Sequence, residues 1–484
     1  MQGKKEFSQR IYYNINLDSL VPEDHLLRRL EKLVSFDFIR GITKSYYSHT
    51  GKPSIDPVVL VKMLLVGYLF DIRSERKLVE EISLNLAYRW YIGYDLDEVV
   101  PNHSIFSKAR VRFGKKLFLD IFEQILIKCM ELGLVSKEGM LIDSTIVKAD
   151  ASIQSLVEVN ISPEQYWKQL DKNQKPKKIL AGDFFTGEVD KNKIGKRRRD
   201  TNRISIRKKS TTDPDATLFY RPGAGSHLSY KAHIATDTNG IITAVSASPS
   251  SLHDIGAVPS LIESHEKMLG IPNWIAADTK YGSEECLKYL QDKNIKTAIR
   301  PETKSSKPDH FSKSRFKYDN STDCYTCPNG KVLKRRAKNY THNRIAYKSN
   351  KKDCNLCPVR EKCISGKGNF RTVSHYDSPC YSKARGWYYS GYGRALYKLR
   401  GTVIEGIFGQ AKVYHDMARS KFRGLAKVEI QFLLTATALN LKKMVKMLDV
   451  YEVKTKISKK FTDIIQVVKD VLWNLINKEA IQVS

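Results

Sequence analysis

The sequence predicts a mixed α/β protein with an all-helical region at its N-terminus. Roughly the first 135 of its 484 residues space their apolar side chains as helices do. From Gly139 onward, short β-rich runs alternate with helix-like segments. The order strand, hairpin, helix, strand, helix, strand is typical of a mixed sheet with helices on its faces. A chain of this length with 41% hydrophobic residues suffices for two to four domains.

Helix starts recur through residues 1–135. The segment from Pro22 places its leucines on one helical face. A second helix is expected to begin at Asp56-Pro57 and to run through Leu69. Proline suits the first turn of a helix, because the N–H that it lacks would have no partner there. A third helix opens at Ser74.

A fourth helix begins in PNHSIFSKARVRFGKK, where Asn102 or Ser104 is the expected cap. It carries four basic side chains, Lys108, Arg110, Arg112 and Lys115. One interpretation is the reading helix of a helix-turn-helix-like unit, with these side chains on phosphates and base edges. The alternative is a solvated basic face on a helix that only packs.

The α/β part contains five strand candidates and two helices. The strands are MLIDSTIV from Met140, then 228–235, 241–247, NWIAAD and IKTAIR, and the helices are 254–269 and 283–293. A long insertion at 152–226 has little apolar periodicity and contains KIGKRRRDTNRISIRKKS, with Arg197, Arg198 and Arg199. It predicts a mobile basic loop that binds a nucleic-acid backbone, or else an ordinary disordered linker.

A second insertion, residues 301–390, carries paired cysteines. Cys324 and Cys327 form one C-x2-C pair, and Cys354 and Cys357 form another. Two such pairs on tight turns can complete a tetrahedral Zn²⁺ site, and reduced thiols that bind no metal are the alternative. The spare candidates that leave the ligand set open are Cys363, Cys380 and His375.

Residues 391–450 predict a long helical region that ends the α/β part. Glu405 and Lys412 lie seven residues apart and so project from the same side of one helix, with Tyr397 and Arg400 just upstream. Residues 451–484 predict a helical tail, whose amphipathic stretch 461–475 suits self-association.

The charge balance favours a polyanionic partner. The chain has 82 Lys and Arg against 52 Asp and Glu, a formal net charge of +30 spread over nearly its whole length. Nucleic acid is therefore the expected partner, since a membrane-surface protein more often confines its charge to an amphipathic helix. No export signal or membrane span is visible, and eight cysteines are too few for a disulfide scaffold, so we expect a cytosolic protein with reduced thiols.

Three acidic residues stand out against this basic background. Asp143 and Asp278 each follow a short apolar run, and Glu405 lies in a helix-like stretch. Singly, either aspartate is most simply a turn or helix cap. A fold that gathers all three would make a carboxylate pocket for divalent metal, which suits cutting or joining a phosphate backbone.

In this order and context, the three acids resemble those of the DDE transposases of bacterial insertion sequences. Asp143 stands in LIDST, Asp278 in AADTKYG with Tyr281 and Gly282, and Glu405 in GTVIEGIFGQAK with Lys412. The resemblance extends over most of the chain. One departure is that four residues separate Arg400 from Glu405, where family members often show three.

The resemblance implies a ribonuclease-H-like catalytic core, residues 136–300 and 391–450, interrupted by the cysteine-containing insertion and preceded by a helical DNA-binding domain over 1–135. Asp143 would lie on the first strand, Asp278 at the end of the fourth and Glu405 on a late helix. These carboxylates would hold two Mg²⁺ or Mn²⁺ ions, leaving Zn²⁺ a structural role.

The implied activity is cleavage of insertion-sequence ends and strand transfer into target DNA. Expected partners are the terminal inverted repeats, the target duplex and a second copy of the chain, in the bacterial cytoplasm at the nucleoid and without a membrane. Expected DNA contacts are Lys108, Arg110, Arg112, Lys115, Arg197, Arg198, Arg199, Tyr281, Arg400 and Lys412. Two alternatives are a ribonuclease-H-like nuclease of another role and an inactive DNA-binding protein derived from a transposase, although no acid of the triad is broken.

Overall fold

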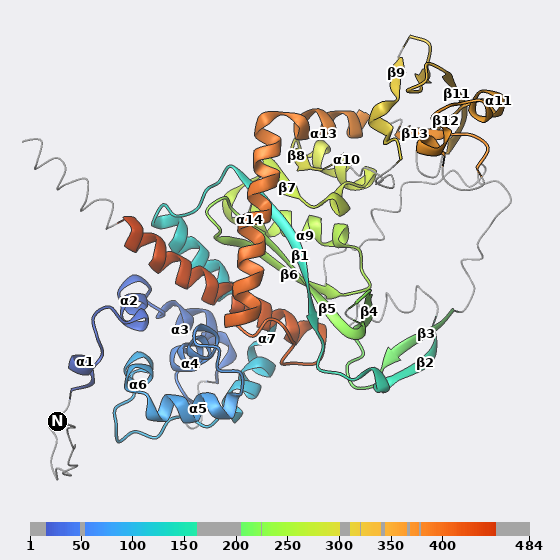
Figure 1. Ribbon diagram of the computed structural model, residues 1–484. Helices are drawn as coiled ribbons and strands as arrows, with labels where there is room; N and C mark the ends of the chain where they lie inside the picture. The colour runs from blue at the N-terminus through green and yellow to red at the C-terminus, as the bar shows by residue number, and fades with distance from the viewer. Residues whose placement is uncertain are drawn as a thin grey trace, which may run out of the picture.

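The computed structural model describes residues 16–48, 54–161, 205–223, 225–300, 310–319, 321–339, 344–364, 368–376 and 379–451. Its helices in these ranges are α1 (Leu17–Leu20), α2 (Leu26–Leu33), α3 (Phe38–Thr43), α4 (Pro57–Leu69), α5 (Glu75–Leu84), α6 (Leu86–Ile92), α7 (Ser104–Glu131), α9 (Val258–Leu269), α10 (Glu284–Asp292), α11 (Lys351–Asn355), α12 (Arg360–Cys363), α13 (Pro379–Tyr389), α14 (Gly391–Tyr414) and a last helix over 425–451. The strands are β1 (Gly139–Lys148), β2 (Leu156–Ile161), β3 (Ser205–Ser210), β4 (Thr217–Arg221), β5 (Gly225–Thr236), β6 (Ile242–Pro249), β7 (Trp274–Ala277), β8 (Lys296–Ile299), β9 (Lys317–Asp319), β10 (Cys324–Thr326), β11 (Val332–Asn339), β12 (Arg344–Lys348) and β13 (Thr372–Tyr376). Figure 1 shows the helical region, the central sheet and a smaller second sheet.

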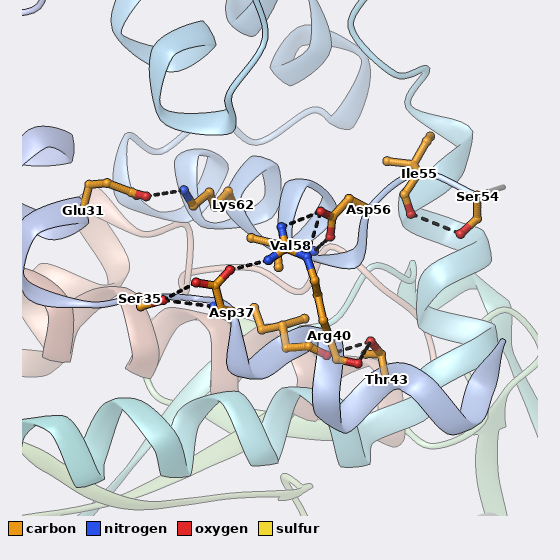
Figure 2. A network of polar contacts seen from close by, with 11 residues as sticks. Glu31, Ser35, Asp37, Arg40, Thr43, Ser54, Ile55, Asp56, Val58 and Lys62 are labelled. Atoms are coloured by element: carbon orange, nitrogen blue, oxygen red, sulfur yellow. Dashed lines mark hydrogen bonds and ion pairs between the residues drawn. The ribbon is translucent and has the colours of Figure 1, made fainter. Parts of the chain in front are cut away.

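The N-terminal region is helical, as predicted. α4 begins at Pro57, and the Asp56 carboxylate caps it by accepting the Val58 N–H at 2.8 Å. Arg40 of α3 donates to the same carboxylate at 2.7 Å and also pairs with Asp37 (Figure 2). This network holds α3 against the start of α4.

α7 is two helical segments joined at Gly114, whose φ of +58° is non-helical. Its apolar side, including Phe113 and Leu117, belongs to one hydrophobic core with the last helix and one face of the central sheet. The helical region is therefore packed directly on the α/β part.

The central sheet confirms the predicted mixed α/β class. Its strand order is β4-β5-β1-β7-β8, with β6 also paired to β5. β1 runs antiparallel to β5 and parallel to β7, and β7 runs parallel to β8. One face packs on α14 and the helical region, and the other packs on α9 and α10.

The second sheet has the order β13-β12-β11-β10-β9 and lies between β8 and α13 in the chain. It encloses a core of its own that includes Tyr325, Leu333 and Tyr347. In Figure 1 it lies apart from the central sheet, beyond α13.

The structure refines two further expectations, on the basic loop and the C-terminal helical region, and a third, on the tail helix, falls outside the described residues. The expected basic loop contains β2, β3 and β4 at its ends, while Arg197, Arg198 and Arg199 lie outside the described residues. The predicted helical region over 391–450 consists of two helices, α14 and the helix over 425–451, which are separated at 415–424, where Asp416 and Gly424 have φ of 52° and 87°. The predicted tail helix 461–475 also lies outside the described residues.

Candidate active site

Asp143 on β1 and Asp278 directly after β7 lie beside each other. Ile142 of β1 pairs with Ala277, the last residue of the parallel strand β7, and the two aspartates are the residues that follow this last pair. Side chains alternate along a strand, and Leu141 and Ala276 belong to the core on the α14 side. Both aspartates therefore face α14.

Each aspartate also holds its own backbone. Asp143 accepts the Ser144 N–H at 2.8 Å, and Asp278 accepts the Thr279 N–H at 2.7 Å as the cap of a short 3-10 turn. The capping role that the sequence offered as an alternative is thus present for Asp278. Each of these hydrogen bonds uses one carboxylate oxygen, so the other oxygen of each aspartate is left for a role in an active site.

Arg400 of α14 supplies the counter-charge. Its Nη1 lies 2.5 Å from the Asp143 Oδ2, its guanidinium lies 5.5 Å from the centre of the Tyr397 ring, and it is only 7% exposed. Burial raises the pKa of Asp143, and the charge of Asp278 raises it further, while the Ser144 N–H and Arg400 oppose the rise. Arg400 therefore provides, from α14, the positive charge that partly neutralises the two neighbouring aspartates at β1 and β7.

Glu405 is on the same helix but is not gathered with the aspartates. Its neighbour Ile404 is fully buried, whereas Glu405 itself is exposed. Within the described ranges, no group of three or more His, Cys, Asp and Glu residues could hold a metal ion as it stands. The structure thus brings together two of the three predicted acids.

Comparison with protein families identifies both ends of this architecture. Residues 15–112 match a family described as "Transposase domain (DUF772)", and residues 326–445 match one described as "Transposase DDE domain". The chain belongs to the DDE transposases of insertion sequences. It is a transposase whose substrate is DNA, and the second match includes Arg400, Glu405 and Lys412 while Asp143 and Asp278 precede it. Searches of curated proteins and of solved structures each gave no significant match.

Two of the expected DNA contacts on α7, Arg110 and Lys115, make internal contacts in the transposase. Arg110 pairs with Glu75 at 2.5 Å and stacks over the Phe422 ring at 4.3 Å. Lys115 pairs with the buried Glu429 at 2.9 Å. Lys108 and Arg112 are exposed and form no ion pair among the described residues, although the Arg112 guanidinium lies over the Tyr47 ring at 5.1 Å; the Lys115 side chain, 41% exposed, is partly accessible as well.

Tyr281 is also corrected as a DNA contact. It is 1% exposed and packs in the core on the α9 and α10 face. Burial raises its pKa, as do the nearby carboxylates of Asp254 and Asp143, so the ring lies close behind the site. Lys412 is half-buried. Burial lowers its pKa, and the positive charge of Arg221 lowers it further.

The structure separates the predicted cysteines. Cys327, Cys354 and Cys357 line one pocket together with Cys363, whereas Cys324 is not among the residues of that pocket. Cys129 and Cys286 are buried, and burial raises the pKa of each thiol to about 12.

Sequence reasoning missed an ion pair on the opposite face of the central sheet. Lys231 of β5 lies 2.8 Å from Asp254 at the start of the 3-10 turn before α9, and both are largely buried. His233, two residues along β5, hydrogen-bonds to Ser248 at 2.8 Å, and burial lowers its pKa to about 4. The sequence showed the alternation of apolar and polar residues over 228–235, but no sequence pattern indicated that Asp254 lies next to Lys231 in the fold.

None of the described helices is both long and apolar enough to span a membrane.

Proposed function

We propose that this transposase cleaves the ends of its insertion sequence and joins them to target DNA by metal-dependent chemistry at Asp143, Asp278 and Glu405. The observation that carries the proposal is the β1–β7 register, which puts two carboxylates side by side under α14. α14 carries Glu405 in the segment that matches the transposase DDE domain.

The strand arrangement supports a ribonuclease-H-like core. β6, β5 and β1 form an antiparallel set, and β7 and β8 continue from β1 in parallel. In such a sheet the first acid lies within the central strand and the second at the end of its parallel neighbour, as Asp143 and Asp278 do.

The donor set fits a hard divalent ion. Carboxylate oxygens are the ligands that Mg²⁺ and Mn²⁺ prefer, and Asp143 already pairs with a cationic group. Asp143, Asp278 and Glu405 would hold the ions, which would activate the attacking hydroxyl and stabilise the leaving oxygen. Arg400, once separated from Asp143, would place its charge near a backbone phosphate.

DNA binding would draw on basic side chains from several segments. Lys108 and Arg112, exposed on α7, would contact the insertion-sequence ends, and Lys412, on the same helix as Glu405, would contact the backbone phosphates together with Arg197, Arg198 and Arg199, which lie outside the described residues. Two ends must be joined in one reaction, so we propose that two copies of the transposase act together in the DNA complex, at the bacterial nucleoid.

The test uses isosteric variants of each acid. Asp143→Asn, Asp278→Asn and Glu405→Gln should each reduce Mg²⁺-dependent nicking and strand transfer by roughly a thousandfold or more, because several kcal/mol of charge stabilisation is lost. Gel-shift affinity for the ends should change little. Asp292→Asn, at the exposed end of α10, is the matched control and should cleave normally.

The other outcomes discriminate among the alternatives. Full cleavage by any one acid variant removes that residue from the site. Wild-type protein that binds the ends but never cleaves them supports an inactive transposase-derived DNA-binding protein, an alternative consistent with the Arg400–Asp143 pair and the outlying Glu405. Cleavage without preference for the ends supports a nuclease of another role.

A further inference from the structure

Four cysteines from separate segments line one pocket in the second sheet. Cys327 follows β10, Cys354 lies in α11, Cys357 follows α11, and Cys363 ends α12. All four are free thiols.

Cys324 is turned away from this pocket. It lies within β10, paired with Asp319 on β9 and Lys334 on β11. Its neighbour Tyr325 is buried in the core of the second sheet, and Cys327 packs against that core. Since successive side chains of a strand point to opposite faces, Cys324 faces the other side. The first C-x2-C pair is therefore not a single tight turn.

The pocket has the turns and donors that thiolate ligands need. The Gly330 N–H donates to the Cys327 carbonyl at 2.9 Å in a turn with φ of 72° at Gly330, and the Lys331 N–H donates to the Cys327 Sγ at 3.3 Å. The Cys357 N–H closes a second turn on the Cys354 carbonyl at 3.4 Å. N–H groups directed at sulfur stabilise the thiolate form over the thiol.

Polar side chains complete the surroundings of the other sulfurs. Asn329 donates from Nδ2 to the Cys357 Sγ at 3.5 Å, and the Ser349 hydroxyl lies 2.9 Å from the Cys354 Sγ. Lys331, Arg360 and Arg371 line the pocket against a single carboxylate, Asp353. This positive balance suits the net negative charge of four thiolates on a divalent ion.

We propose that Cys327, Cys354, Cys357 and Cys363 form a structural Zn²⁺ site that fastens α11 and α12 to the second sheet, and that Cys324 is not a ligand. Four thiolates are a common ligand set of closed structural zinc sites, with sulfur about 2.3 Å from the metal. Among the described residues, these four thiols do not have the geometry of a formed metal site, so binding of the ion would require the sulfur atoms to move closer together. Its binding would add to the stability of a sheet whose own core is small.

Metal content of full-length variants tests the ligand set. Wild-type protein and Cys324→Ser should each contain about one Zn²⁺ per chain by elemental analysis, which is the content of a single closed site. Cys327→Ser, Cys357→Ser and Cys363→Ser should lose most of it after dialysis against a mild chelator. Cys324→Ser is the matched control, because it removes a thiol of the same sheet. Loss of zinc from Cys324→Ser, or its full retention by Cys363→Ser, overturns the assignment.

A second measurement needs no variant that might misfold. Wild-type protein is treated with an alkylating reagent before and after zinc removal, and each cysteine is followed by mass spectrometry. Before removal, Cys324 should react while the four ligands are protected, and after removal all five should react. Protection that is unchanged by removing zinc, or a metal-free purified protein that does not take up added Zn²⁺, contradicts the proposal. Neither measurement depends on DNA cleavage, so failure here leaves the proposed function untouched.

Discussion

Replacing Lys115 by methionine should destabilise the transposase rather than weaken its hold on DNA. The Lys115 Nζ lies 2.9 Å from the Glu429 Oε2, and the Glu429 side chain is 9% exposed. Burial raises the pKa of Glu429, and the charge of Lys115 opposes that rise. Without Lys115, Glu429 must stay charged without its partner in a buried place or take up a proton.

The magnitude follows from how far each partner is buried. Breaking a fully buried pair costs about 3–5 kcal/mol, since an uncompensated charge remains. The Lys115 side chain is 41% exposed, so solvent screening reduces the expected loss to about 1–2 kcal/mol. Glu429→Gln added to Lys115→Met should recover much of this loss, because the amide needs no counter-charge.

Urea unfolding of the single variants and the double variant, followed by circular dichroism, measures the coupling. The loss of stability in Lys115→Met should be smaller at acidic pH. Because the pKa of Glu429 is raised in the folded protein, protonated Glu429 favours the folded state at low pH, and this contribution to the free energy of unfolding is lost as pH rises through the folded pKa. A variant with unchanged stability and weakened binding to the ends would refute the structural assignment of Lys115 and return it to the DNA interface.

Two further predictions concern the basic helix and a buried histidine. The double variant Lys108→Ala, Arg112→Ala should weaken binding to the ends and reduce the slope of log affinity against log salt by roughly one per lost phosphate contact. Arg110→Ala, which removes the ion pair with Glu75, should mainly lower the urea midpoint of unfolding. An unchanged salt slope for the double variant would exclude this face of α7 as a DNA-binding surface. Burial lowers the pKa of His265 to about 4, so the unfolded chain takes up a proton first and stability should fall by about 3 kcal/mol from this group as pH drops from about 6.5 to about 4. His265→Gln should flatten that fall in a pH series of urea midpoints, against a background in which His233 and His415 act in the same direction and Asp237, with its pKa raised to about 6, acts in the opposite one; an unchanged slope would refute it.

The strands and the placement of the two aspartates were accessible from local patterns. Apolar runs bounded by turn residues located β1, β5, β6, β7 and β8, and parallel neighbours bring their following residues together. The partner of Asp143 was not accessible. Arg400 lies 257 residues further along the chain, and no local periodicity encodes which helix crosses which strand.

Charge and spacing alone could not decide the roles of other residues, for identifiable physical reasons. A basic helix looks the same in sequence whether its cations face DNA or neutralise acids such as Glu75 and Glu429. A C-x2-C pair also looks the same on a turn and on a strand. Only the β10 pairing shows that Cys324 and Cys327 face opposite ways.

The internal contacts of α7 have a consequence for how DNA binding and chemistry are connected. Arg110 lies in the segment that matches the first transposase family, and Phe422, over which it stacks, lies in the segment that matches the DDE domain. Glu429, the partner of Lys115, is on the helix over 425–451 that follows α14, the helix of Arg400 and Glu405. Cations that look available for DNA thus join the helical region to the elements around Asp143. Because the two parts share one hydrophobic core, a duplex bound on the exposed face of α7, as proposed, would be positioned relative to the acids by packed side chains rather than by a flexible linker.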